Sequence, residues 1–229
     1  ELVPTIVHDL KNPLGALSSV AESAKETLTK LLEREPEGPH VEATAEVAED
    51  LGVMRAQLRR LRDMVQSILN LSRQTEGYEE EFLVTDAAAD ALEAIALQVK
   101  DLPRIEVKRE LAGVIPEARG NRGQLSQVMV NLLWNAVQAL GEEGGTVVLR
   151  ARDGNGEIVI DVADSGHGVP PEAREKIFEP FYTTKEASHG TGLGLYLCKQ
   201  IIERHGGRVE VGESDLGGAL FRVVIPAAD

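Results

Sequence analysis

Cysteine, aromatic residues and long apolar runs are all scarce in this chain of 229 residues. Its one cysteine, Cys198, excludes an internal disulfide and any zinc site made of several cysteines, and its apolar surroundings (LGLYLC) predict a buried thiol. Aromatic residues make up 3% of the chain, so the core has to be built from Leu, Val, Ile and Ala. The chain has no run of about 18 apolar residues and no signal peptide, which predicts a soluble, cytoplasmic segment without membrane contact.

Basic residues are also in short supply, with 24 Lys and Arg against 38 Asp and Glu, and the formal net charge is −14. Nucleic-acid binding depends on cations that neutralise phosphates, so this balance excludes it. An anionic ligand would need a metal ion or backbone dipoles to offset the repulsion. The sequence begins inside an expected helix, which suggests a piece of a longer chain and leaves open an anchor upstream.

Two stretches within residues 1–75 carry apolar residues at alternating steps of three and four, which is typical of the seam of a helical bundle. Between them, the segment EPEGP at 35–39 contains two prolines and a glycine, which end a helix. The pattern predicts an antiparallel helical hairpin. A lone hairpin leaves one apolar face uncovered, so we expect two copies to form a four-helix bundle, with a coiled-coil linker as the alternative. The seam residues are Val3, Val7, Leu10, Leu14, Leu17, Ala21, Ala24, Leu28, Leu31, Val47, Leu51, Met54, Leu58, Leu61, Val65 and Ile68.

A polar segment at 76–81 indicates a domain boundary, and over 82–229 the pattern changes to mixed strands and helices. This order predicts the α+β class. A hairpin turn is expected at Asp153-Gly154-Asn155-Gly156, and a helix end at Gly206-Gly207. The expected elements are strands at 82–85 and 104–109, helices at 87–99 and 122–140, strands at 146–151 and 157–163, a helix at 192–205, and strands at 208–212 and 219–225.

The helix at 122–140 carries an unusual polar stripe opposite its apolar face. Carboxamides at Gln127, Asn131, Asn135 and Gln138 replace the Glu and Lys expected of a solvated stripe in so charged a chain. Asparagine weakens a helix interior, and its amide oxygen can ligate a hard cation. The stripe therefore predicts a binding function, with a merely polar face as the alternative.

Two glycine-rich segments follow. Asp164-Ser165-Gly166-His167-Gly168 comes at a strand end, where glycines permit close approach of a flat ligand and the carboxylate can accept hydrogen bonds; an ordinary turn is the alternative. The second segment, GTGLGL at 190–195, opens a helix whose free N–H groups can bind phosphate. It lacks the GK[ST] of a P-loop, and its spacing differs from that of the dinucleotide-binding fingerprint.

The first expected helix holds His8, Asp9 and Asn12, with Pro13 one turn further on. His8 lies one residue past the seam position Val7, so we expect it at the flank of the bundle, within reach of solvent. Pro13 removes a backbone hydrogen bond to the carbonyl of Asp9 and is expected to bend the helix there.

These elements, in this order, resemble the H, N, G1 and G2 boxes of the sensor histidine kinases, and IFEPFYTTK at 177–185 resembles their F box. The resemblance covers nearly the whole chain, and NAVQAL together with a short lid looks most like the nitrogen-regulation type. It implies a dimerisation and histidine-phosphotransfer hairpin over 1–75, a linker at 76–81, and a Bergerat-type α/β sandwich that binds ATP over 82–229.

The resemblance also implies roles for single residues. His8 matches the phosphoacceptor, Asp9 its acidic neighbour, and Asn12 the residue that orients water for dephosphorylation of the partner. Gln138 stands where many relatives carry Lys, which leaves Lys176 and Lys185 as candidate phosphate contacts. Asn135 matches the Mg²⁺ ligand, and the nucleotide contacts are Asn131, Asn135, Asp164, Gly166, Gly168, Lys185, Gly190, Thr191, Gly192, Leu193 and Gly194.

The function that the resemblance implies is ATP- and Mg²⁺-dependent autophosphorylation on His8 in a homodimer. Transfer to an aspartate of a response-regulator receiver domain follows, and Asn12 suggests phosphatase activity on the same partner. Two alternatives stay open: a dimeric scaffold with a dead nucleotide site, and another Bergerat ATPase such as a chaperone or a mismatch-repair motor. Neither a stimulus nor a cognate regulator is indicated by the sequence.

Overall fold

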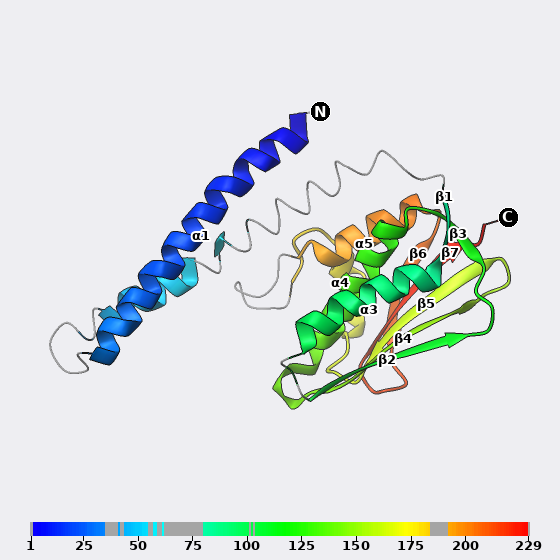
Figure 1. The fold of residues 1–229 in the computed structure, drawn as a ribbon. Helices are drawn as coiled ribbons and strands as arrows, with labels where there is room; N and C mark the ends of the chain where they lie inside the picture. Colours follow the sequence, from blue (N-terminus) through cyan, green and yellow to red (C-terminus); the bar gives the residue numbers. More distant parts are fainter. Residues whose placement is uncertain are drawn as a thin grey trace. The chain divides into compact units, whose positions relative to one another are not determined.

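The computed structural model describes residues 2–34, 41, 44–54, 57–58, 61, 80–100, 102, 104–183 and 192–228, with the backbone alone at 2–13, 31 and 34. The chain divides into two compact units, one of residues 1–74 with 181–193 and one of residues 75–180 with 194–229 (Figure 1). None of the described helices combines the length and the apolar content needed to cross a bilayer.

The first unit contains the long helix α1 (Leu2–Arg34), which is continuous through Pro13, and a second helical stretch at 44–54. The two run side by side, because a Cβ added at Gly52 would lie 3.3 Å from Nζ of Lys25. Of the described seam residues, Ala21 and Leu58 are buried, and Leu14, Ala24, Leu28 and Leu51 are half-buried. The seam prediction is wrong at Val47, which is exposed while its neighbour Ala48 is buried. Among the described residues of this unit, the large exposed apolar side chains are Leu17, Val20, Val47, Val53, Met54, Leu61 and Phe181.

The second unit is an α+β fold, which confirms the predicted class. Five strands form one mixed sheet in the order β2-β4-β5-β7-β6, in which only the β2–β4 pair is parallel. Two further strands, β1 and β3, pair antiparallel with each other. The strands are β1 (Glu80–Leu83), β2 (Ile105–Ala112), β3 (Glu117–Gly120), β4 (Gly145–Asp153), β5 (Glu157–Asp164), β6 (Arg208–Glu213) and β7 (Ala219–Pro226).

Three helices cover one face of the five-stranded sheet (Figure 1). They are α3 (Val84–Val99), α4 (Arg122–Leu140) and α5 (Gly194–Arg204), and three short 3-10 turns lie at Gly141–Glu143, Pro171–Ala173 and Lys176–Phe178. Helix α4 contacts both other helices and the strands β4 and β5. Its buried apolar residues, Leu125, Val128, Met129, Leu132, Leu133, Ala136, Val137 and Leu140, make it the centre of an aliphatic core.

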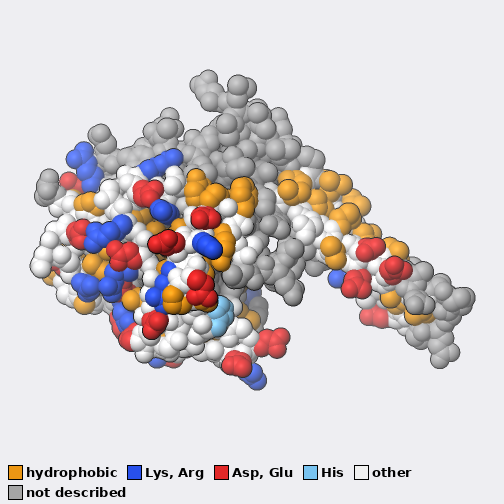
Figure 2. Space-filling view, turned by 180° about the vertical axis from the view of Figure 1, so that it is seen from behind, with side chains coloured by type: hydrophobic (Ala, Val, Ile, Leu, Met, Phe, Trp, Pro, Cys, Tyr) orange, Lys and Arg blue, Asp and Glu red, His pale blue; other side chains and the backbone are white. Residues whose placement is uncertain are grey.

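The other face of the sheet carries a row of alternating charge. One residue from each strand lies in register, in the order Glu110, Arg150, Asp161, Arg222 and Glu210. Arg150 donates to Glu110 at 2.8 Å, and Arg222 donates to both carboxylate oxygens of Asp161 at 2.7 and 2.8 Å. Opposite charges on facing strands stabilise the pairing, and Figure 2 shows acidic and basic side chains interspersed over the surface of this unit.

Most predicted elements of this unit are present, with shifted ends. Helix α4 has the predicted bounds, and Asn155 and Gly156 adopt positive φ (62° and 91°) in the predicted hairpin turn. The bounds of the strand predicted at 82–85 are wrong, because β1 ends at Leu83. Helix α3 begins at Val84, three residues before the predicted start. Strand β3 was not predicted, because its sequence EARG is short and charged and becomes a strand only by pairing with β1.

The predicted end of α5 is a tight C-terminal motif. Gly206 has φ +71°, and the N–H groups of Gly206 and Gly207 donate to the carbonyls of Glu203 and Ile202 at 3.1 and 2.9 Å. This pair of bonds is the Schellman arrangement. Gly207 also passes so close to β7 that an added Cβ would overlap the carbonyl oxygen of Val224.

Gly207→Ala is expected to lower the free energy of unfolding by about 2 kcal/mol, because the backbone has to move away from β7. Gly212→Ala is the matched control, since a Cβ there meets nothing within 4 Å, and it should change stability by less than about 0.5 kcal/mol. Urea unfolding measures both variants. Equal losses would contradict the close-approach argument.

Candidate nucleotide site

The carboxamide stripe of α4 lies opposite its apolar face, as predicted. Asn131, Asn135 and Gln138 are half-buried and Gln127 is exposed. Nε2 of Gln127 donates to Oδ1 of Asn131 at 3.1 Å. The helix begins at Asn121, whose side chain accepts from the backbone N–H of Gln124 at 3.0 Å. This cap fixes the residue at which the helix begins.

Helix α5 packs against α4 through Cys198, which is fully buried, as predicted. Its thiol lies 3.9 Å from the carbonyl oxygen of Val128 and also hydrogen-bonds the side chain of Asn131. Burial raises the pKa of the Cys198 thiol to about 12, against a smaller lowering by the bond to Asn131. Asn131 is thus held between Gln127 and Cys198.

Asp164 is the last residue of β5 and is only 1% exposed. One carboxylate oxygen, Oδ1, accepts from the backbone N–H groups of Gly166 and Ala219 at 2.8 and 3.1 Å. Within the part of the chain that the structure describes, Oδ2 has no hydrogen-bond partner. A buried carboxylate oxygen without a partner is costly, which favours a ligand that donates a hydrogen bond to it.

Of the two glycines after Asp164, the first is required by close packing and the second by its backbone conformation. A Cβ at Gly166 would lie 2.6 Å from the carbonyl oxygen of Ala139 in the last turn of α4, and Gly168 has φ +70°. Sequence reasoning missed a third glycine, Gly218, where a Cβ would overlap Oδ1 of Asp164. Gly218 comes from the turn before β7, and nothing in its local sequence (DLGGA) indicates a partner 54 positions earlier.

The second glycine segment leads into α5. Gly192 has φ +67°, Leu193 is buried, and Gly194 is the first residue of the helix. Gly192 accepts from the N–H of Phe181 at 2.9 Å, and Phe181 has a positive φ of 68°, which is rare for a residue with a side chain. Lys185, Gly190 and Thr191 lie outside the described residues.

The phosphoacceptor candidates belong to the other unit. The backbone of His8, Asp9 and Asn12 is helical within α1, and their side chains lie outside the described part of the chain. Of the predicted site residues in the second unit, Asp164, Gly166 and Gly168 lie together at the end of β5, and Gly166 approaches Ala139 in the last turn of α4, the helix that also carries Asn131 and Asn135.

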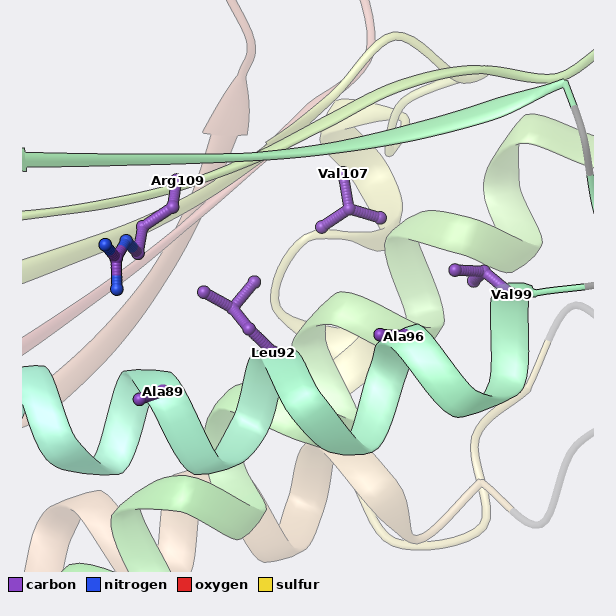
Figure 3. A pocket seen from close by; sticks show the side chains of 6 residues that line it. All are labelled: Ala89, Leu92, Ala96, Val99, Val107 and Arg109. Atoms are coloured by element: carbon purple, nitrogen blue, oxygen red, sulfur yellow. The ribbon is translucent and has the colours of Figure 1, made fainter.

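A groove of about 510 Å³ lies between α3 and the edge strand β2. Figure 3 shows Leu92 and Val107 pointing toward each other across it, with Arg109 at one end. Its lining residues are Ala89, Leu92, Ala96, Val99, Val107 and Arg109, and none of the predicted site residues is among them.

Comparison with known proteins agrees with the order of the two units. Residues 1–77 match the family described as the His Kinase A (phospho-acceptor) domain. Residues 120–229 match the family described as histidine kinase-, DNA gyrase B-, and HSP90-like ATPase. The chain belongs to the sensor histidine kinases.

Curated relatives of this family align over nearly the whole chain. It is 28% identical to sensor histidine kinase ZraS of Salmonella typhi (98% of this chain, 45% of ZraS). It is 31% identical to sensory histidine kinase/phosphatase NtrB of Escherichia coli O157:H7 (99% of this chain, 62% of NtrB). The chain thus spans about half the length of the curated relatives it matches.

Two solved structures align with nearly the whole chain. Full-length ShkA in complex with AMPPNP is 27% identical, with a TM-score of 0.69, and the match covers 99% of this chain and 45% of ShkA. ThkA in complex with response regulator protein TrrA is 25% identical, with a TM-score of 0.67, and the match covers 98% of this chain and 60% of ThkA.

The buried thiol makes stability depend on pH. The pKa of Cys198 is raised from 9.0 in the unfolded chain to about 12 in the fold, so its contribution is complete below pH 9 and is lost as the pH rises toward 12. Between pH 8.5 and 10.5, the free energy of unfolding should fall by about 2 kcal/mol more in the unmodified chain than in Cys198→Ala. Denaturant unfolding at both pH values measures this. An equal fall in the free energy of unfolding in the unmodified chain and in Cys198→Ala would contradict the prediction.

Proposed function

We propose that this chain is the catalytic core of a protein-histidine kinase that uses ATP to phosphorylate its own His8 and then passes the phosphoryl group to an aspartate of a response regulator. The observation that carries the proposal is the buried carboxylate of Asp164, with one oxygen unpartnered among the described residues, in a chain of this family. The bound AMPPNP of ShkA and the response regulator bound to ThkA support both steps.

The functions of the two parts of the chain are assigned from the two matched families. We assign residues 1–75 to dimerisation and phosphotransfer and 82–229 to ATP binding. Of the segment 76–81 between them, Glu80 and Glu81 belong to β1 and so to the ATP-binding part. Covering the exposed Leu17, Met54 and Leu61 with a second copy would complete a four-helix bundle, which supports a homodimer. Because the reaction consumes ATP, the location that suits this segment is the cytoplasm.

In the nucleotide site, Oδ2 of Asp164 would accept a hydrogen bond from the adenine amino group. Gly166 and Gly168 leave room for the flat base beside the backbone. The N–H groups at the start of α5, with Gly190, Thr191, Gly192, Leu193 and Gly194, would bind the phosphates, and Lys185 is a further phosphate contact.

The amide oxygens of Asn135 and Asn131 suit Mg²⁺, which takes one or two protein oxygens and completes its shell with phosphates and water. The ion would neutralise phosphate charge, which a chain of net charge −14 otherwise repels. The half-buried position of both residues and the fixed amide of Asn131 are consistent with this role.

At His8, the neutral imidazole nitrogen attacks the γ-phosphorus, the bond to the oxygen of ADP breaks, and a P–N bond forms. Asp9 would orient the ring and stabilise the imidazolium charge that develops, as the carboxylate does in a Ser-His-Asp triad. The resemblance also makes Asp9 the acceptor of the ring proton once the P–N bond has formed. The P–N bond then breaks as the aspartate of the regulator attacks. Asn12 would orient water for hydrolysis of that acyl phosphate, and the kinase/phosphatase name of NtrB supports this reverse activity.

His8→Gln is expected to abolish phosphorylation of the chain. Incubation with γ-labelled ATP and Mg²⁺ should produce label that is stable in base and lost in acid, as a phosphoramidate is. His40→Gln is the matched control, because it removes another histidine of residues 1–75 and should keep the label. Acid-stable label, or label on His8→Gln, would refute the proposal, and ATP binding without any label would favour the scaffold alternative.

Asp164→Asn should weaken ATP binding by roughly 10- to 100-fold. The amide can still accept the two backbone bonds at Oδ1 but presents a donor where the adenine amino group needs an acceptor. Calorimetry measures the affinity. Asp161→Asn is the control: Asp161 is also buried on β5 and is paired with Arg222 on the outer face, so it should cost about 2 kcal/mol of stability and leave ATP affinity unchanged. The opposite pattern would exclude Asp164 from the site.

A further inference from the structure

The turn that joins β6 to β7, residues 214–218, is packed against the strand end that carries Asp164. The N–H of Gly218 donates to the carbonyl oxygen of Asp164 at 3.1 Å, and the N–H of Ala219 donates to Oδ1 of the same residue at 3.1 Å. Because an added Cβ at Gly218 would overlap Oδ1, the backbone of the turn and the Asp164 carboxylate are in close contact. The position of the turn therefore decides the rotation of the Asp164 carboxylate.

The turn is held on its far side by an ion pair. Both carboxylate oxygens of Asp215 accept from the guanidinium of Arg150, at 2.9 and 3.0 Å. The guanidinium lowers the pKa of Asp215, so the pair is charged at neutral pH. Arg150 stands on β4, which pairs with β5 directly, and its third bond goes to Glu110 on β2. The arginine thus links the turn to the same strands that position Asp164.

A second pair ties the turn to the far end of the glycine loop. Arg174 donates to Glu213, the residue before the turn, at 3.1 Å, and also to the carbonyl oxygen of Val169 at 3.2 Å. Val169 directly follows Gly168. The loop from Asp164 to Val169 is therefore fastened to the turn at both ends.

From these contacts we infer that Asp215 is a positioning residue for adenine recognition: through Arg150 it holds the 214–218 turn, and the turn holds Asp164 in the orientation that accepts the base amino group. This rests on the proposed ATP site. The side chain of Asp215 is largely exposed and its carboxylate pairs with Arg150, so its proposed effect on the nucleotide is indirect.

The signature of such a role is selectivity for the base. ATP carries an amino group at position 6 and inosine triphosphate carries an oxygen there, while the ribose and phosphates are the same. If Asp215 positions Asp164, Asp215→Asn should raise the Kd for ATP by about fivefold, as expected from loss of one well-aligned surface pair. The Kd for inosine triphosphate should change much less, so the preference for ATP narrows.

Glu110→Gln is the matched control, because it removes the other ion pair of Arg150 and leaves the turn anchored. Titration calorimetry with both nucleotides and thermal unfolding are measured on the complete chain. The two variants should lose similar stability, and only Asp215→Asn should narrow the ATP preference, with Asp215→Glu restoring part of it.

The inference would be overturned if Asp215→Asn kept the full preference for ATP over inosine triphosphate, or if Glu110→Gln reduced that preference equally. Either result would leave ATP binding by the unmodified chain intact. Absence of ATP binding, or of any preference for ATP, in the unmodified chain would instead overturn the proposed site and this inference together. The two failures are therefore distinguishable in one set of titrations.

Discussion

Burial of the apolar face of α4 is the constraint on which the rest of the second unit depends. With that face against the sheet, the helix cannot rotate, so the carboxamide stripe has one direction in which to point. The glycine loop then packs on the last turn of α4 through Gly166 and Ala139, and α5 packs on its middle through Cys198. The contact through Cys198 lies in the aliphatic core and cannot shift without opening it, which ties the position of α5 to the main source of stability.

Apolar burial holds the helices against the sheet, and the polar interactions then orient individual side chains and loops. Asp164 is oriented by two backbone N–H groups, one local and one from the start of β7. The charged row on the outer face keeps five strands in register without contributing to the core, and Arg150 connects that row to the turn beside Asp164. The exposed pairs that Arg150 makes with Glu110 and Asp215 are individually weak, so their value lies in where they hold the backbone.

Periodicity and turn chemistry are sufficient to predict the elements whose reasons are local. Helix α4 carries its own cap and apolar repeat, and the Asn155-Gly156 turn and the Gly206-Gly207 helix end have residues suited to positive φ. Strand β3 and the start of α3 at Val84 depend on partners elsewhere, so a single sequence does not reveal them. The same holds for the proposed site: Asp164 and Asn135 are predicted from their motifs, while Gly218 contacts Asp164 only because the sheet brings β7 beside β5.

The hydrogen bond between Phe181 and Gly192 has an evolutionary consequence. It closes the base of the intervening segment, so most of the entropy of bringing its ends together is lost once, whatever the sequence between them. Doubling the length of such a segment adds only about 0.6 kcal/mol. A change in the length of this stretch is therefore nearly neutral for folding, so natural selection on it would act through the proposed phosphate contacts at Lys185, Gly190 and Thr191 and not through stability.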